Sequence, residues 1–272
     1  MSQTPEAESI AALVELHRGL ERKGPGDPDY SRYILSTLNP ALWPSPPRIA
    51  DMGCGSGAGA LLLAQHFQSR VRAVDLSSVF MDELKVRAQQ KGLEHLIVPI
   101  LGDMAQLNWP ARSVDLIWSE GAAYNLGFEQ FLLTWRSPLA NHGWAIISEL
   151  SWFTEHPPER AIAYWQMAYP AMGHESENCQ RAQRAGYRVH ATHRLPSLAW
   201  WNHYYEPLRE RVQSIDVTSP NPFNNQSDNL LNHPSISPSA IQLVIHELEA
   251  EMALFEQCSD SYGYTFYVLQ AS

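Results

Sequence analysis

The sequence predicts an α/β fold in which a mostly parallel sheet carries helices on both faces. Between residues 48 and 149, short apolar runs alternate with amphipathic stretches. Alternation at this spacing is typical of parallel strands joined by helices. A glycine-rich turn follows the first apolar run, as expected where a strand leads directly into a helix. At 272 residues, the chain can hold one such domain and an insertion.

Seven strands are expected, and the last of them is expected to run antiparallel. In chain order they cover residues 48–52, 71–76, 96–101, 114–118, 144–149, 187–194 and 262–269. Apolar residues at helical spacing predict helices over residues 10–20, 31–38, 59–67, 78–90, 128–135, 159–172, 175–185, 197–215 and 239–257. Ser77 or Ser78 would cap the helix over 78–90, and Gly92 would end it. Pro207 should kink the aromatic helix over 197–215.

The alternation of strands and helices stops after Glu149, where two helical stretches follow with no strand between them. We therefore expect four regions. They are N-terminal helices that complete a ligand cleft (1–47), an α/β core (48–150), a helical insertion (151–185), and the C-terminal part of the sheet (186–272), which includes the aromatic helix and a long loop over 216–234. The insertion and the aromatic helix would form a lid.

Charge and composition exclude several kinds of partner. The formal net charge is −10 and basic residues do not cluster, which argues against nucleic-acid and membrane-surface partners. No apolar run approaches the roughly 18 residues of a membrane span, and the acidic N-terminus does not resemble a signal peptide.

Three scattered cysteines favour a reducing, cytoplasmic location. His190, His193 and His203 lack metal-ligand spacing, so we expect no metal. The oligomeric state stays open, with a homodimer as one option.

The most informative segment is Ile49–Gly59, in which an apolar run ends at Asp51 and four glycines follow at alternate positions. Glycine tolerates positive φ and leaves the backbone bare for a close ligand. The free N–H groups at the start of the following helix favour an anionic ligand group. The segment also satisfies the dinucleotide pattern G-x-G-x-x-G/A, so an NAD(P)-dependent oxidoreductase is one alternative. A non-catalytic binding protein is another, because ligand motifs do not establish turnover.

Carboxylates stand at the ends of three successive strands. Asp51 precedes the first glycine, where it can face an amine of the ligand. Asp75 ends the second strand, where a carboxylate can accept hydrogen bonds from both ribose hydroxyls. Asp103 and Met104 follow the third strand, where they can accept from an adenine amino group and pack on its ring. These positions favour a ligand that carries an adenosyl group and an amine.

Four segments carry a resemblance to a known family: Asp51–Gly57, Val74–Ser77, Gly102–Met104 and Ser113–Trp118. Together they resemble the ordered motifs of class I S-adenosylmethionine-dependent methyltransferases, over roughly residues 47–149. The small-molecule branch, which includes ubiquinone- and menaquinone-biosynthesis methyltransferases, is the most similar. The resemblance implies a Rossmann-like fold, S-adenosyl-L-methionine as cofactor, and in-line transfer of its methyl group to a small-molecule acceptor.

The resemblance also implies roles for particular residues. The expected cofactor-binding residues are Asp51, Gly53, Gly55, Gly57, Asp75, Leu76, Asp103, Met104 and Ser119. The expected acceptor-binding residues are Tyr124, Asn125, Trp152, Trp201, Tyr204 and Tyr205. If the acceptor needs a general base, the candidates are His203, Glu149 and Glu120.

Overall fold

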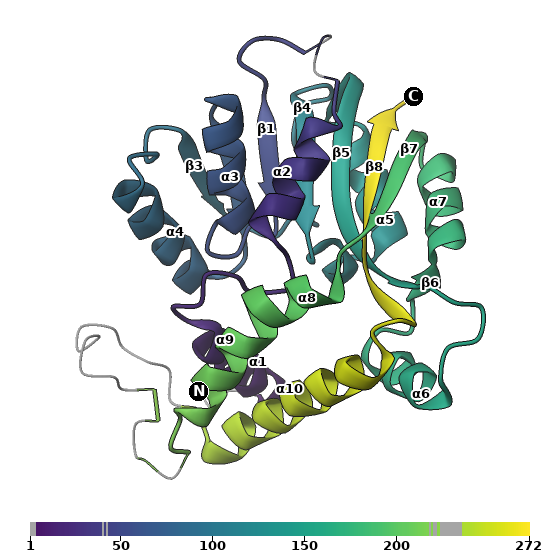
Figure 1. The fold of residues 1–272 in the computed structure, drawn as a ribbon. Helices are drawn as coiled ribbons and strands as arrows, with labels where there is room; N and C mark the ends of the chain where they lie inside the picture. The colour runs from purple at the N-terminus through teal and green to yellow at the C-terminus, as the bar shows by residue number, and fades with distance from the viewer. Residues whose placement is uncertain (1–3, 40, 42, 218, 220–221, 224–235) are drawn as a thin grey trace.

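The structure, a computed structural model, describes residues 4–39, 41, 43–217, 219, 222–223 and 236–272. An eight-stranded sheet forms its centre, with the strand order β3-β2-β1-β4-β5-β8-β7 and a short β6 beside β5 (Figure 1). The strands are β1 (Ile49–Met52), β2 (Val71–Asp75), β3 (Ile97–Leu101), β4 (Val114–Glu120), β5 (Leu139–Trp152), β6 (Gly173–His174), β7 (Tyr187–Arg194) and β8 (Tyr262–Ala271).

The predicted fold class is confirmed. Strands β1 to β5 pair in parallel, and β8 runs antiparallel to both of its neighbours, β5 and β7. The seven expected strands are present close to their expected bounds, although β5 begins five residues before the predicted start at Trp144. The added strand β6 has only two residues, too few to show the alternation from which a strand is recognised in sequence.

Ten α-helices are assigned in the described part of the chain: α1 (Pro5–His17), α2 (Pro28–Ser36), α3 (Ala58–Phe67), α4 (Ser78–Gln90), α5 (Phe128–Arg136), α6 (Glu159–Ala168), α7 (Glu175–Arg184), α8 (Ser197–Trp200), α9 (Glu206–Gln213) and α10 (Pro238–Cys258). Side chains of α2, α3 and α4 join one core cluster, and those of α5 and α7 join a second. Helices α1, α6, α9 and α10 gather beyond one end of the sheet (Figure 1). Among the described residues, no helix combines the length and the apolar character needed to cross a membrane.

The predicted helix α4 has the expected bounds and the expected cap. Ser77 is the capping residue, and its hydroxyl accepts a hydrogen bond from the N–H of Phe80. Helix α1 begins earlier than predicted because Thr4 caps it and Pro5 occupies its first turn. It ends at His17, three residues before the predicted end.

The predicted aromatic helix over 197–215 is present as one helical run over residues 197–213, with a π turn inside it. It is divided into α8, a π-helical turn (η3, Trp201–Tyr205) and α9. Pro207 lies near the start of α9 and cannot donate a backbone hydrogen bond to the preceding turn. The wide π turn falls directly before it, where the helical ladder is interrupted. Most of the predicted loop over 216–234 lies outside the described residues.

Candidate functional site

A cavity of about 880 Å³ lies at the carboxyl ends of the parallel strands. Its wall on the sheet side comes from the segments that follow β1, β2, β3 and β4. Its opposite wall comes from α1 and from residues 18–25. Ligands of open α/β sheets bind at this edge, because the loops that leave neighbouring parallel strands converge there.

The glycine turn after β1 is held by the end of β2. The N–H groups of Gly53 and Cys54 both donate to the carbonyl oxygen of Val74, at 2.9 Å each. The N–H of Gly55 donates to Asp75 Oδ2, and the N–H of Ser77 donates to Asp75 Oδ1, both at 2.8 Å. Asp75 therefore fixes the turn and still has lone pairs for a ligand hydroxyl at the cavity wall.

Two of the three expected glycines line the cavity, and close packing also requires glycine at the third. Gly53 and Gly55 are in the wall. At Gly57, which is not among the lining residues, a Cβ would lie 2.1 Å from Leu84 Cδ1. The backbone there has φ of +90°, so both the contact with α4 and the backbone conformation exclude a larger residue.

Asp51 is buried in the cavity wall, and its Oδ2 has no hydrogen-bond partner among the described residues. Burial raises the pKa of this carboxyl well above its usual range, and the charges of Glu120 and Asp75 raise it further. The backbone N–H of Ala60 donates to this carboxylate, but its buried Oδ2 is left without a partner. Such an atom is costly, and an amine or another cation would offset that cost. The group therefore fits the amino end of S-adenosylmethionine.

The opposite end of the cavity fits an adenine ring. Asp103 and Met104 line it, and the Asp103 carboxylate accepts from the N–H of Ala105 at 2.8 Å and from the Gln106 amide at 3.0 Å. Leu76 is 71% exposed at the rim of the cavity. These residues offer an apolar face beside a hydrogen-bond acceptor.

The wall opposite the sheet includes a segment that the sequence did not single out as a site. We call residues 18–27 the strap. Arg22 of the strap pairs with Glu120 at 2.5 Å, and Lys23 pairs with Glu83 of α4 at 2.6 Å. The guanidinium of Arg87 donates to the carbonyl oxygens of Leu20 and Glu21. No local pattern in the sequence reveals these pairings, because each joins residues at least sixty positions apart.

Two expected residues that follow one another in the chain have different surroundings. Glu120 lines the cavity, and it accepts hydrogen bonds from Ser31 at 2.8 Å, from Trp118 Nε1 at 3.0 Å and from Arg22. A carboxylate so fully engaged is a poor general base. Ser119 is buried, and its hydroxyl donates to the carbonyl oxygen of Met52 at 2.9 Å, so it does not line the cavity.

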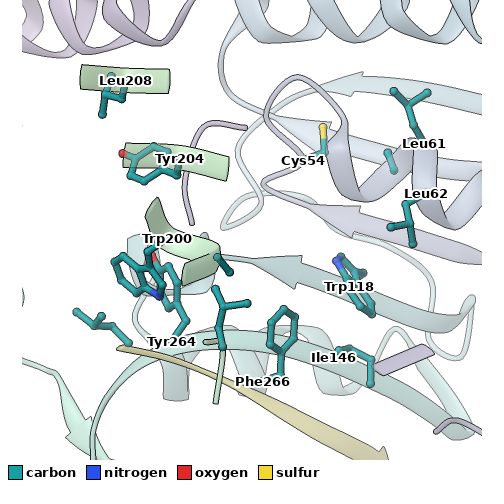
Figure 2. Close-up of a cluster of buried hydrophobic side chains, with 14 of the residues drawn as sticks. Cys54, Leu61, Leu62, Trp118, Ile146, Trp200, Tyr204, Leu208, Tyr264 and Phe266 are labelled. Atoms are coloured by element: carbon teal, nitrogen blue, oxygen red, sulfur yellow. The ribbon is translucent and has the colours of Figure 1, made fainter. Parts of the chain in front are cut away.

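Only two of the six expected acceptor residues, Tyr124 and Asn125, line the cavity. The other four, Trp152, Trp201, Tyr204 and Tyr205, pack in the aromatic core instead. Figure 2 shows Trp200 of the aromatic segment beside Tyr264 of β8, with Tyr204 further along the same segment. Trp200 stacks on Phe255 and on Tyr264, with ring centroids 4.3 and 4.9 Å apart.

Tyr204 has a partner within the core. His17 Nδ1 lies 2.7 Å from the Leu13 carbonyl oxygen and donates to it, so its Nε2 is free to accept from the Tyr204 hydroxyl at 3.1 Å. Burial lowers the pKa of His17 to about 4, which keeps the ring neutral. This pair ties α1 to the aromatic segment, so Tyr204 has a structural contact in place of the expected one with an acceptor.

The two remaining candidates for a general base lie outside the cavity lining. His203 pairs with Asp27 of the strap at 3.2 Å and is 39% exposed. Glu149 is 1% exposed on β5, and burial raises its pKa to about 8, an effect that the neighbouring Tyr169 hydroxyl partly offsets. A carboxyl with such a pKa is suited to proton transfer near neutral pH.

The expected lid region, residues 151–185, does not contribute to the cavity lining. Helix α7 packs on β7 and on α5, and α6 contacts α10. Among the described residues, no group of three or more His, Cys, Asp or Glu side chains is arranged to hold a metal ion.

Comparisons with known proteins find methyltransferases. Residues 49–143 match the model of a methyltransferase domain family. A sarcosine/dimethylglycine N-methyltransferase from Aphanothece halophytica is 22% identical over 216 residues, which cover 76% of each chain. Four further relatives match over 25% or less of their own length.

Solved structures share the fold over nearly the whole chain. A methyltransferase from Geobacter sulfurreducens, crystallised with S-adenosyl-L-homocysteine, superimposes with a TM-score of 0.74 at 18% identity and covers 96% of this chain and 98% of its own. The [4+2]-cyclase SpnF has a TM-score of 0.70 at 14% identity and covers 99% and 96%. Residues 49–143 therefore carry a methyltransferase domain, in a chain that shares the fold of S-adenosylmethionine-dependent methyltransferases.

Proposed function

We propose that the chain transfers the methyl group of S-adenosylmethionine to a small-molecule acceptor inside the cavity between the sheet and the strap. The order of groups along the wall carries this proposal. Leu76, Asp103 and Met104 suit adenine, Asp75 suits the ribose, and Asp51 with the glycine turn suits the methionine end. If these residues served only in tight turns and helix caps, they would not be expected to line one cavity together.

The charge of the cavity supports a cationic cofactor. Six carboxylates and three basic side chains line it, and Arg22 and Lys23 are each paired with a carboxylate. The acceptor attacks the methyl carbon, the bond from that carbon to sulfur breaks, and S-adenosylhomocysteine leaves. The protein mainly has to align the reacting atoms and exclude water, which can lower a barrier by about 7–11 kcal/mol.

The small-molecule acceptor is supported by the relatives. One relative, which matches over 76% of this chain, is named for sarcosine and dimethylglycine, and one structural neighbour is a phosphoethanolamine N-methyltransferase. The net charge of −10 argues against a nucleic-acid acceptor. All three cysteines are unpaired, which supports the proposal of a cytoplasmic location.

Calorimetric titration with S-adenosylhomocysteine tests the cofactor site. We expect Asp51→Asn and Asp75→Asn each to weaken binding by about 10- to 100-fold, because each removes a charged hydrogen-bond acceptor at the cavity wall. Asp82→Asn, on the exposed face of α4, serves as the matched control and should leave the affinity unchanged. Binding of NADH in preference to S-adenosylhomocysteine would contradict the proposal.

Turnover needs its own measurement, because the same fold occurs in a [4+2]-cyclase. Purified protein with S-adenosylmethionine and a panel of amines, phenols and carboxylates should release S-adenosylhomocysteine with at least one acceptor class. Tyr124→Phe should lower the rate of S-adenosylhomocysteine release with the acceptor more than it lowers the affinity for the cofactor. The reason is that Tyr124 and Asp103 line opposite ends of the cavity wall.

A further inference from the structure

Helix α1 is apolar on two sides, whereas a helix at the surface of a protein usually has one apolar side, which faces the core. Ala12 and Leu16 of α1 are fully buried and belong to the core cluster. Ile10, Leu13 and Val14 lie on the other side of the helix, by the helical repeat, and all three line the cavity. We call these three residues the aliphatic face.

The aliphatic face is not used in folding the described part of the chain. Ile10 is 58% exposed and Leu13 is 41% exposed, so a large part of each side chain is left uncovered. Single exposed apolar residues are ordinary, but neighbouring ones that line a cavity are typical of a surface that covers a ligand.

The cofactor does not account for this face. The residues that suit adenine, ribose and the methionine end all belong to β1 or to the segments that follow β2 and β3, on the sheet side of the cavity. Helix α1 forms the opposite wall. A second molecule that enters between the bound cofactor and α1 would cover the aliphatic face.

The segment after β4 adds apolar surface to the same cavity. Tyr124 belongs to a short 3-10 turn, η2 (Ala123–Asn125), and Leu126 follows it. Both side chains line the cavity, and both are at least partly exposed. An acceptor in the cavity therefore has an aromatic ring and a leucine available as well as the aliphatic face.

The charged side chains on the α1 side of the cavity are engaged with one another. Glu15 and Arg18, in the last turns of α1 and just after it, pair at 2.6 Å. Arg22 and Lys23 of the strap pair with carboxylates on the other side of the cavity. The aliphatic face precedes these pairs in the chain, so what it offers to a ligand is the covering of apolar surface, which is favourable in proportion to the area covered.

We propose that the methyl acceptor has an aromatic or aliphatic body and that this body packs on the aliphatic face of α1. The inference rests on the proposed function and names the acceptor class of that same site. A small zwitterion such as sarcosine has no such body and would leave Ile10 and Leu13 in contact with water.

The test is calorimetric titration of the protein loaded with S-adenosylhomocysteine, using pairs of compounds that differ by a propyl group. The pairs are benzylamine and 4-propylbenzylamine, phenol and 4-propylphenol, and benzoate and 4-propylbenzoate, with sarcosine as the small polar compound. Each covered methylene group contributes about fourfold in affinity. We therefore expect the propyl compound of at least one pair to bind at least about tenfold more tightly than its parent, and sarcosine to bind more weakly than both. Equal binding within all three pairs, tighter binding of sarcosine, or binding of none of the compounds would overturn the inference.

Substitutions locate the preference on α1. Ile10→Ser and Leu13→Ser should each weaken the best propyl compound by about fivefold or more and leave the affinity for S-adenosylhomocysteine within about twofold. Leu13→Met keeps an apolar side chain of similar volume and should retain the preference. Leu133→Ser removes a half-exposed leucine of α5 that does not line the cavity, and this control should change neither affinity. An unchanged preference in both serine variants of α1 would overturn the inference.

The two affinities separate this inference from the proposed function. If the wild-type protein does not bind S-adenosylhomocysteine, the proposed function fails. If it binds S-adenosylhomocysteine without preferring the propyl compounds, only the assignment of the aliphatic face fails. If the serine variants of α1 lose affinity for S-adenosylhomocysteine as much as for the propyl compound, the face covers the cofactor and the inference is wrong. An unchanged midpoint of thermal unfolding shows that each variant is folded.

Discussion

Two buried carboxyl groups, Asp51 and Glu149, have pKa values raised mainly by burial. Neither has a described hydrogen-bond partner for its Oδ2 or Oε2 atom. Such groups reduce the stability of the folded chain once they ionise, and proteins keep them where a ligand or a proton transfer uses them. Of these two groups, Asp51 lies in the cavity wall and Glu149 lies outside the cavity lining.

Glu149 leads to a prediction about stability and pH. Its pKa is about 8 in the folded chain against an ordinary value of 4.5, so its favourable contribution is complete below about pH 4.5 and is lost as the pH rises through about 8. We expect Glu149→Gln to be more stable than the wild type by on the order of 3–5 kcal/mol at about pH 9, and to show no gain at about pH 4. Denaturant unfolding at both pH values measures this difference.

The groups around Glu149 do not disturb this comparison of unfolding free energies at two pH values. Tyr169 and the charge of Arg181 lower its pKa, and neither titrates in the acid half of the range. Asp51 carries a shift of the same sign in both proteins, so its effect cancels in the comparison. A stability difference that stays constant across the pH range would show that Glu149 does not titrate as stated.

At the scale of elements, the strand–turn–helix unit of β1 and α3 depends on one close approach. Gly53 has φ of +72°, and a Cβ there would lie 2.2 Å from Ala122 Cβ. Gly92, which follows α4, has a similar φ of +66°, but a Cβ at that position would meet no atom within 4 Å. The two glycines share their backbone conformation and differ in steric contact.

This contrast gives a matched pair of variants. Gly92→Ala should cost about 1–2 kcal/mol of unfolding free energy, from backbone strain alone. Gly53→Ala should cost about 1–3 kcal/mol more, because Ala122 has to move, and it should also weaken binding of S-adenosylhomocysteine. Thermal unfolding and calorimetry measure the two effects. Equal losses of stability would show that the turn relaxes without cost.

At the scale of the whole molecule, the strap joins the N-terminal region to the far end of β4. The Arg22–Glu120 pair has side chains only 8% and 10% exposed, and a Cβ on Gly26 would lie 2.7 Å from Glu120 Oε2. Helix α1 also contacts α10 and α9. We propose that α1 and the strap, rather than residues 151–185, form the cover of the cavity.

A double-mutant cycle measures this connection. Arg22→Met should cost about 3–5 kcal/mol, because Glu120 stays buried without its cation, and the double variant Arg22→Met/Glu120→Gln should recover a large part of the loss. Arg32→Met removes an exposed pair with Asp29 and should change stability by less than about 1 kcal/mol. Additive losses in the cycle would show that the two side chains do not interact.

The sequence by itself determined the sheet, its antiparallel last strand and the carboxylates that stand at strand ends. Apolar runs and glycine turns are local, and parallel strands bring their carboxyl ends to one edge, so Asp51, Asp75 and Asp103 could be placed at a common cavity before its shape was known. The methyltransferase family could also be predicted from these segments, and the domain match confirms it.

Only the tertiary structure decided which distant side chains meet. Arg22 and Glu120 are 98 residues apart, and Glu251 of α10 meets the Tyr205 hydroxyl across 46 residues. The aromatic residues Trp201 to Tyr205 gave no sign in sequence of whether they face a ligand or the core, and packing against α10 and β8 placed them in the core. Periodicity tells which face of a helix is apolar, and the surface that covers that face depends on the rest of the chain.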